Sequence, residues 1–425
     1  MRKQRNNIFY GADLLLILLY SSLILLGLIN IYSVSSTGAN FEAFNLSSRF
    51  GTQLLWIGLS IPFVIIVFFL DAKLYERFST LFYLFILVVL AGLFVFGKNI
   101  NGATSWYSFG AFNLQPSEFA KAITALVVAK IINESQFDLR KFRSQWKVFL
   151  IVLLPAILIG LQPDPGSGLV YLAFFFVFYR EGLPWYYIFF GLFAVILFVL
   201  TMAFGKSIIL ISLIILTLIS AIYIRYVRMR RLKKFGFDLL IILLFSSIFV
   251  LSVDYIFNNV FEQHHRDRFM VILGKTSDTK GIGYNTDQSV LTIGSGGFIG
   301  KGFMYGDRTR GKFVPEQDTD YIFSTIGEEW GFVGSSVVVI LFTTFLLRIL
   351  FLAERQKNKF SRVYGYSVAS IFFLHFMINI GMVIGLLPTI GIPLPFFSGG
   401  GSALLGFTLL LFIFVKLDAN KVYEW

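Results

Sequence analysis

Apolar runs of about 20 residues recur along almost the whole chain, and they limit its possible folds more than any other feature. Hydrophobic residues make up 56% of the 425 residues, which is typical of a polytopic membrane protein. Within lipid, only α-helices and closed β-barrels satisfy every backbone polar group. The runs are continuously apolar and not alternating, which favours helices. We therefore predict an all-α polytopic integral membrane protein, a bundle of 10–12 transmembrane helices formed as one membrane domain over residues 1–425.

Twelve candidate spans lie near residues 13–33, 53–71, 79–97, 117–132, 148–161, 168–180, 184–204, 207–225, 237–257, 331–350, 363–386 and 400–417. The first span follows a basic start, MRKQRNN, and has no clean small-residue cleavage site. We interpret it as a retained anchor and not as a signal peptide. The chain has no cysteine, which excludes disulfides and thiol chemistry.

The positive charges indicate which connections face the cytoplasm. Cations cluster at both ends of the chain and in every second connection, at Arg2–Arg5, Lys73–Arg77, Arg140–Lys147, Arg180, Arg225–Lys234, Arg348–Arg362, Lys416 and Lys421. Cytoplasmic loops carry such an excess, so both termini are predicted to be cytoplasmic and the large loop over 258–330 extracytoplasmic. The same rule accounts for the net charge of +12, so nucleic acid is excluded as a partner.

Most of the polar chemistry lies in that one loop, and its densest acidic segment is FVPEQDTDYIF. The segment places Glu316, Asp318 and Asp320 just before an apolar run. One interpretation is a solvated turn in which Thr319 or Asp320 caps the next helix. The other is a carboxylate at the membrane–water boundary that acts as a general base, with a pKa raised by partial burial. The residues alone leave both interpretations open.

A glycine-rich segment, GSGGFIGKG, precedes the acidic segment in the same loop. It superficially resembles a phosphate-binding loop, but it lacks the strand–loop–helix context of a nucleotide site. We favour a flexible or tightly turned loop. The alternative is a close approach of the backbone to a pyrophosphate, assisted by Lys301.

Several polar groups lie within the predicted membrane region. Glu118 and Lys121 are three residues apart and share one helical face, so they are either functional residues or a structural ion pair. The segment LQPDPGSG places Asp164 in a broken or re-entrant stretch, which is tolerated only beside a polar cavity. The prolines and glycines of 385–402 likewise exclude one continuous helix. His375 is expected to make a polar contact within its own helix.

Two classes of function fit these features. One is an enzyme that acts on a lipid-linked substrate at the outer leaflet, and the other is a transporter or lipid flippase. Transporters usually place binding groups near the membrane midplane and show an internal repeat. No repeat is evident here and the carboxylates concentrate outside the membrane, which favours the enzyme.

Five segments over about residues 100–402 resemble, in order, the signatures of the SEDS family (shape, elongation, division and sporulation). They are NGATSWYSFGAFNLQPSEFAK, QPDPGSG, GYNTDQSVLTIGSGGFIGKG, PEQDTDYIFSTIGEEWGFVG and NIGMVIGLLPTIGIPLPFFSGGGS. Within the family, the GKG of Gly300–Gly302 favours the elongation branch over the division branch. The chain departs from the family pattern at Ser105 (usually Arg), at Asp318 (usually His) and after Ser398, where a tyrosine is missing. The family has ten spans, so the resemblance implies a two-span insertion within 184–257.

The resemblance implies a peptidoglycan glycosyltransferase of the bacterial cytoplasmic membrane that polymerises lipid II by an inverting displacement, with Asp320 as the catalytic base. It assigns further residues to the substrate or to a polar cavity beneath the loop: Glu118, Lys121, Asp164, Trp106, Gln115, Glu316, Lys301, Arg310 and Ser398. Candidate cations for the departing pyrophosphate are Arg266, Arg268, Lys301, Arg308, Arg310 and Lys312. No cofactor is certain, and a divalent cation, Mg²⁺ or Mn²⁺, is a candidate. The expected partners are membrane lipids and a class B penicillin-binding protein, which supplies transpeptidation.

Overall fold

The computed structural model describes residues 11–36, 48–100, 102–110, 112–227, 232–260, 263, 266, 270 and 283–421. The chain forms two compact units. The larger unit combines Met1–Leu183 with Asn285–Trp425, and the smaller unit is Pro184–Tyr284.

The first half of the larger unit contains three long helices, a small sheet, two more long helices and a broken segment. The helices are α1 (Leu14–Ser35), α2 (Arg49–Phe69), α3 (Ala72–Phe96), α4 (Pro116–Asn133), α5 (Phe142–Gly160), α6 (Pro165–Leu169), η1 (Val170–Ala173) and α7 (Phe174–Arg180). Strands β1 (Lys98–Ile100), β2 (Ala103–Phe109) and β3 (Phe112–Leu114) form an antiparallel sheet in the order β1-β2-β3. Side chains cap the N-termini of α1 and α2: Asp13 accepts a hydrogen bond from Leu16 N, and Ser48 accepts one from Gly51 N.

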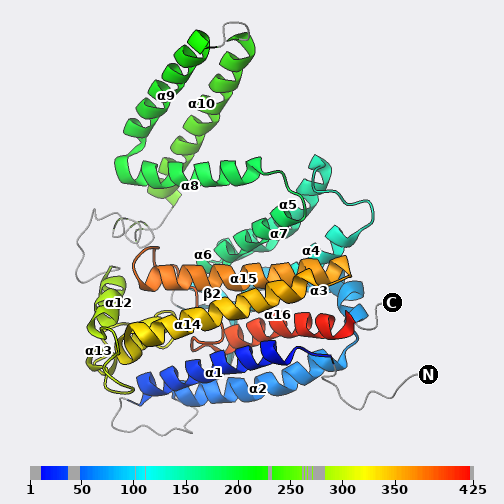
Figure 1. Cartoon of the computed structure of the whole chain (residues 1–425), viewed down its shortest axis with the longest axis vertical. Coiled ribbons are helices and arrows are strands. Elements are labelled where there is room, and N and C mark those ends of the chain that lie inside the picture. Colours follow the sequence, from blue (N-terminus) through cyan, green and yellow to red (C-terminus); the bar gives the residue numbers. More distant parts are fainter. Residues whose placement is uncertain are drawn as a thin grey trace. The chain divides into compact units, whose positions relative to one another are not determined.

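The second half contains α12 (Tyr284–Ser295), α13 (Asp307–Arg310), α14 (Ile322–Glu354), α15 (Lys359–Val383) and α16 (Gly401–Asn420). Helix α14 is broken at Gly331, whose φ of 63° and ψ of −157° are non-helical. Helix α15 packs between α14 and α4, while α1 packs on α14 and α2 on α16 (Figure 1). The core of this unit lies where α4, α15 and α16 meet. In the most apolar stretches of α15 and α16, 67% and 78% of the residues are buried.

The smaller unit consists of α8 (Tyr186–Phe204), α9 (Lys206–Val227), α10 (Leu232–Tyr255) and the π-helix η2 (Ile256–Val260). Leu197, Ile209, Leu213 and Val250 form a buried cluster between its helices. The three spans predicted within 184–257 all belong to this unit. That two of them form an insertion stays a prediction.

Ten helices of the described part of the chain are long and apolar enough to cross a membrane, so the chain is a multi-pass membrane protein. The predicted bundle of membrane helices is confirmed, but the small sheet β1–β3 was not predicted and the count of twelve spans is not confirmed. Helix α4, predicted as the fourth span, carries the charged side chains of Glu118, Lys121 and Lys130 and is not among the ten. The predicted span at 168–180 consists of short helices, η1 and α7, behind a broken segment at Asp164. As predicted, 385–399 forms no helix.

Candidate active site

Asp320 lies in a turn, Glu316–Tyr321, that directly precedes α14. The turn is closed by main-chain hydrogen bonds from Thr319 N (3.1 Å) and Tyr321 N (3.2 Å) to Glu316 O. The side chain of Asp320 is half-buried. The prediction that Thr319 or Asp320 caps the helix is wrong, because the cap position is Tyr321 and the helix has no side-chain capping hydrogen bond. The acidic segment therefore forms a separate element, which we call the Asp320 turn.

Three successive carbonyl groups of the Asp320 turn accept hydrogen bonds from the end of α15 and the segment that follows it. Asp318 O accepts from Gly399 N at 2.8 Å, and Thr319 O accepts from Ser398 Oγ at 2.6 Å. Asp320 O accepts from Asn379 Nδ2 at 2.8 Å. The backbone on which the Asp320 carboxylate stands is therefore fixed from one side by residues 379–399.

Asn379 opens the signature NIGMVIGLLPTIGIPLPFFSGGGS but was not predicted as a site residue, and it contacts the chain on both sides of the Asp320 site. Its fully buried amide also donates to Ile392 O at 2.8 Å. The neighbouring Gly391 has a φ of 77°, and a Cβ at this glycine would lie 3.5 Å from Asp320 Oδ2. The amide of Asn379 thus fixes both the peptide group of Asp320 and the segment around Gly391 that faces the Asp320 carboxylate. The available signal was its place at the start of that signature, as a single asparagine in an apolar helical run.

We expect Asn379→Leu to lower the stability of the chain, because two buried carbonyl groups lose their donor. Each unsatisfied buried group costs about 1–3 kcal/mol. The midpoint of thermal unfolding in detergent, followed by circular dichroism, measures the loss. Asn99→Ala is the control, since Asn99 is exposed and only bonds to the nearby Gly102 N. Equal midpoints for the two variants would contradict the role given to Asn379.

The N-terminal end of α2 also contacts the Asp320 turn. Arg49 Nε lies 3.0 Å from Asp318 Oδ2, and one turn later Gln53 Oε1 accepts from Gly400 N at 3.2 Å. Asp318 stands where the SEDS pattern has a histidine, so it adds a negative charge close to Asp320. The ion pair with Arg49 offsets that charge.

Hydroxyl groups join the Asp320 turn to two other signature segments. Tyr321 OH lies 2.7 Å from Thr389 Oγ1 and 3.2 Å from Thr286 Oγ1, and the two threonine oxygens are 3.1 Å apart. Thr286 lies in the first turn of α12, and Thr389 lies in the 385–399 segment. Motifs that are far apart in the sequence therefore meet beside Asp320.

The glycine-rich segment packs tightly on the broken part of α14, which confirms the interpretation as a tight turn. A Cβ on Gly296 would lie 2.0 Å from Gly327 O, and one on Gly300 would lie 2.3 Å from Glu329 O. The main-chain N–H groups of Lys301 and Gly302 donate to Glu328 O (3.0 Å) and Glu329 O (2.9 Å). Because α14 occupies these two donors, they are not available to bind a pyrophosphate.

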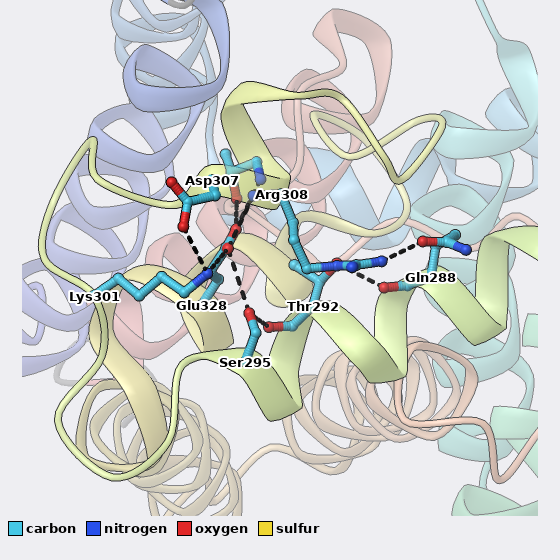
Figure 2. A network of polar contacts seen from close by, with 8 residues as sticks. Gln288, Thr292, Ser295, Lys301, Asp307, Arg308 and Glu328 are labelled. Carbon is cyan, nitrogen blue, oxygen red and sulfur yellow. Dashed lines mark hydrogen bonds and ion pairs between the residues drawn. The ribbon is translucent and has the colours of Figure 1, made fainter.

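Two of the predicted loop cations are engaged around the buried Glu328 (Figure 2). Lys301 Nζ lies 2.8 Å from Glu328 Oε1 and 3.2 Å from Asp307 Oδ2. The hydrogen bond to Glu328 raises the pKa of Lys301 above its ordinary value, so the ammonium group stays charged at neutral pH. Arg308 bonds along α12 to Gln288 and, at 3.1 Å, to Thr292 Oγ1.

The remaining predicted loop residues lie in different surroundings. Arg310 and Lys312 are exposed, and so is Glu316, whose Oε2 accepts from Thr319 Oγ1 at 3.1 Å. Arg266 belongs to the smaller unit, where it bonds to Gln263 Oε1 at 2.8 Å. Arg268 lies outside the described residues.

Within the membrane part, Glu118 and Lys121 form the predicted ion pair and are almost fully buried. Lys121 Nζ lies 2.8 Å from both carboxylate oxygens of Glu118 and 3.0 Å from His375 Nε2. The prediction of a contact within the helix of His375 is wrong, since its partners are Lys121 on α4 and, at 3.3 Å, Pro393 O. The pair therefore joins α4 to α15.

The other predicted cavity residues, Gln115, Trp106 and Asp164, lie at the start of α4, in β2 and at the start of α6. Gln115 Nε2 donates to Asp164 Oδ2 at 2.8 Å, and Asp164 Oδ1 caps α6 through Ser167 N at 3.1 Å. A Cβ on Gly166 would lie 2.6 Å from Ile390 O, so α6 packs on the chain beside Gly391. Trp106 is half-buried in β2, and its neighbour Ser105 is buried where the SEDS pattern has an arginine.

The structure thus brings Asp320 together with Ser398, Asn379 and Arg49–Asp318, whereas Glu118 and Lys121 form a separate buried cluster. Within the described ranges, no three His, Asp or Glu side chains gather in a way that could hold a metal ion. What the Asp320 site offers is a half-buried carboxylate on a fixed backbone, in a loop that also carries the exposed cations Arg310 and Lys312.

Comparisons with known proteins identify relatives over most of the chain. Peptidoglycan glycosyltransferase RodA of Treponema pallidum (strain Nichols) is 29% identical to this chain over 436 residues, covering 96% of this chain and 98% of the relative. Peptidoglycan glycosyltransferase MrdB of Escherichia coli (strain K12) is 29% identical over 352 residues, covering 82% and 80%. The solved structure "Structural coordination of polymerization and crosslinking by a peptidoglycan synthase complex" contains a chain of similar fold, with a TM-score of 0.71 at 24% identity and coverage of 97% and 99%. The sequence model of the family FTSW_RODA_SPOVE, described as "Cell cycle protein", matches residues 13–237 and 194–423, so the chain belongs to this family.

Proposed function

We propose that the chain is a peptidoglycan glycosyltransferase that polymerises lipid II into β-1,4-linked glycan strands at the outer face of the cytoplasmic membrane, during cell elongation and maintenance of rod shape. The names of the relatives support the reaction class. The observation that carries the proposal is the Asp320 turn, which holds a half-buried carboxylate on a fixed backbone at the end of a membrane helix. Such a site suits a reaction at the membrane surface on a lipid-anchored sugar.

In the proposed mechanism, Asp320 acts as a general base. Its carboxylate removes the proton from the 4-hydroxyl of the acceptor's GlcNAc as that oxygen attacks the anomeric carbon of the donor's MurNAc. The bond from this carbon to the pyrophosphate oxygen breaks, and undecaprenyl pyrophosphate leaves. One displacement converts the α-linkage of the donor into the β-linkage of the product without a covalent enzyme intermediate. Asp320 then releases its proton to water.

The departing pyrophosphate needs positive charge in its surroundings. Lys301 and Arg308 are engaged around Glu328, so we assign this role to the exposed Arg310 and Lys312 of the same loop. A divalent cation, Mg²⁺ or Mn²⁺, would add to this charge. Within the described residues no three His, Asp or Glu side chains gather for such an ion, so it would bind mainly to phosphate oxygens of the substrate.

The proposal includes a topology and a partner. Both termini lie in the cytoplasm and the loop with Asp320 lies outside, as the distribution of cations predicts. A class B penicillin-binding protein supplies transpeptidation, because no motif of the chain resembles a transpeptidase. Membrane lipids cover the exposed apolar faces of the long helices.

Two alternatives remain. A division-specific polymerase of the same family would perform the same chemistry at a different place in the cell, and depletion of the chain would produce filaments instead of round cells. A lipid II flippase would move the substrate without using a base.

Polymerisation of purified lipid II tests the proposal. The full chain is co-purified with its class B partner, whose own transpeptidase is blocked, and the products are separated by gel electrophoresis. Glycan strands are expected. Absence of strands together with movement of lipid II across vesicle membranes would favour the flippase.

The Arg49–Asp318 ion pair gives a test of the charge beside Asp320. Arg49→Asp and Asp318→Arg, each alone, place two like charges together, and we expect slower polymerisation for both. The exchanged pair, Arg49→Asp with Asp318→Arg, should recover most of the rate. Because Arg49 is 68% exposed, the energetic coupling is small, about 0.2–1 kcal/mol. Equal rates for the single and exchanged variants would show that the pair has no influence.

A further inference from the structure

Glu328 is a buried carboxylate whose hydrogen-bonding capacity is used entirely within the chain. Its Oε1 accepts from Lys301 Nζ (2.8 Å), Arg308 N (3.0 Å) and Ser295 Oγ (3.3 Å), as Figure 2 shows. Its Oε2 accepts from Thr309 N (2.7 Å) and Thr309 Oγ1 (2.8 Å). An ionised carboxylate has about four acceptor sites, so these donors leave no capacity for a substrate. With a side chain that is 0% exposed, Glu328 acts on its neighbours and not on reactants.

Thr309 connects Glu328 to the Asp320 turn. While its N–H and hydroxyl groups bond to Glu328, its carbonyl oxygen accepts from Gln317 Nε2 at 3.0 Å. Gln317 is buried and belongs to the Asp320 turn. A continuous series of hydrogen bonds therefore leads from Glu328 through Thr309 and Gln317 to the backbone just before Asp320.

The segment between Lys301 and the Asp320 turn has little regular secondary structure to stabilise its conformation. Its one helix, α13, has four residues. Met304, Lys312 and Glu316 have φ values of 64°, 51° and 55°, a region that costs free energy for residues other than glycine. Contacts with the rest of the fold must impose such a backbone, and Glu328 provides a concentrated set of them.

We propose that Glu328 is a positioning residue for the reaction: it fixes the segment Lys301–Thr309 against α14 and, through Thr309 and Gln317, sets the place of Asp320. The kinetic part of this inference rests on the proposed function. Loss of Glu328 would leave Asp320 chemically competent but displaced. Because a displacement of about 1 Å can cost about 100-fold in rate, the effect falls on kcat and much less on KM.

Three variants of the full chain, each with its class B partner, test the kinetic part. In Glu328→Gln the amide replaces one acceptor oxygen, and we expect kcat with lipid II to fall about 10- to 100-fold while KM changes little. Gln317→Ala, which breaks the series downstream, should show the same pattern, and the double variant should lose no more than either single one. Asp307→Asn is the control, because this carboxylate contacts the same Lys301 but is 83% exposed.

Hydrogen exchange of the Asp320 turn supplies a measurement that needs no activity. In Glu328→Gln, the amides of Thr319 and Tyr321 should exchange faster than in the parent chain, since their bonds to Glu316 O are no longer held in place. If the parent chain makes no polymer, the proposed function fails. The exchange rates would still show whether Glu328 fixes the Asp320 turn. Unchanged exchange and kcat in Glu328→Gln, or additive losses in the double variant, would overturn the proposal. Should Glu328→Gln not fold, a parent-like kcat in Gln317→Ala would overturn it.

Discussion

Replacement of Asp320 by Asn is expected to abolish detectable polymerisation of lipid II. The amide has nearly the same shape as the carboxylate but cannot take a proton from the acceptor hydroxyl, and general-base catalysis contributes about 10²- to 10⁴-fold in rate. The substitution leaves the bond from Asn379 to the carbonyl of residue 320 in place, so the turn should keep its backbone. The measurement is the amount of glycan strand formed by parent and variant, each with its class B partner whose transpeptidase is blocked.

Asp307→Asn provides a matched control, since it removes an exposed carboxylate from the same loop. It should retain the parental rate, and the unfolding midpoints of parent, Asp320→Asn and Asp307→Asn should agree within a few degrees. Polymer formed equally by parent and Asp320→Asn would remove Asp320 as the base. If neither chain forms polymer and both move lipid II, the flippase explains the protein better.

The second large effect is expected from Lys121→Met, which leaves the carboxylate of Glu118 buried without its partner. Breaking a buried ion pair by removing one partner costs about 3–5 kcal/mol, because the remaining charge is neither solvated nor compensated. Lys121 also contacts His375 Nε2 at 3.0 Å, so the link between α4 and α15 is lost at the same time. We expect a clearly lower midpoint of thermal unfolding in detergent and a lower yield of folded chain.

Two further variants separate lost charge compensation from lost packing. Lys130→Met on the same helix removes a more exposed ammonium group that bonds to Arg77 O, and it should change the midpoint little. The double variant Glu118→Gln with Lys121→Met removes both charges, and it should be more stable than Lys121→Met alone. A double variant that is no more stable than the single one would show that packing around Lys121, and not the uncompensated charge, controls stability.

The sequence was sufficient for the parts of the molecule that depend on composition and local pattern. Continuous apolar runs predicted the membrane helices, and the i, i+3 spacing predicted the Glu118–Lys121 pair. Prolines and glycines predicted the broken segments at Asp164 and 385–399. The importance of the Asp320 turn came from a resemblance, because three acidic residues before a helix are equally compatible with a simple cap.

Long-range partners could not be predicted in the same way. Asn379 lies 59 residues from Asp320, and Arg49 reaches Asp318 from the start of α2. The spacing of apolar residues in a helix does not indicate which distant carbonyl group its single asparagine will bind. Glu328 lies just before the predicted span at 331–350, and its contacts depend on the path of the loop over 301–309. Such pairings are decided by packing in three dimensions.

The partners of the Asp320 turn also determine when the site can form during synthesis. Arg49 is made early, whereas Asn379, Ser398 and Gly399 come from the last membrane helices and the segment between them. A nascent chain that has reached α14 therefore carries the acidic turn with three carbonyl groups still lacking their donors. The turn acquires its fixed backbone only when residue 399 has been added and α15 has packed beside α14. Assembly of the site is thus tied to synthesis of the last part of the chain, so a chain that stops before residue 398 lacks two of these three donors and cannot hold Asp320 in its final place.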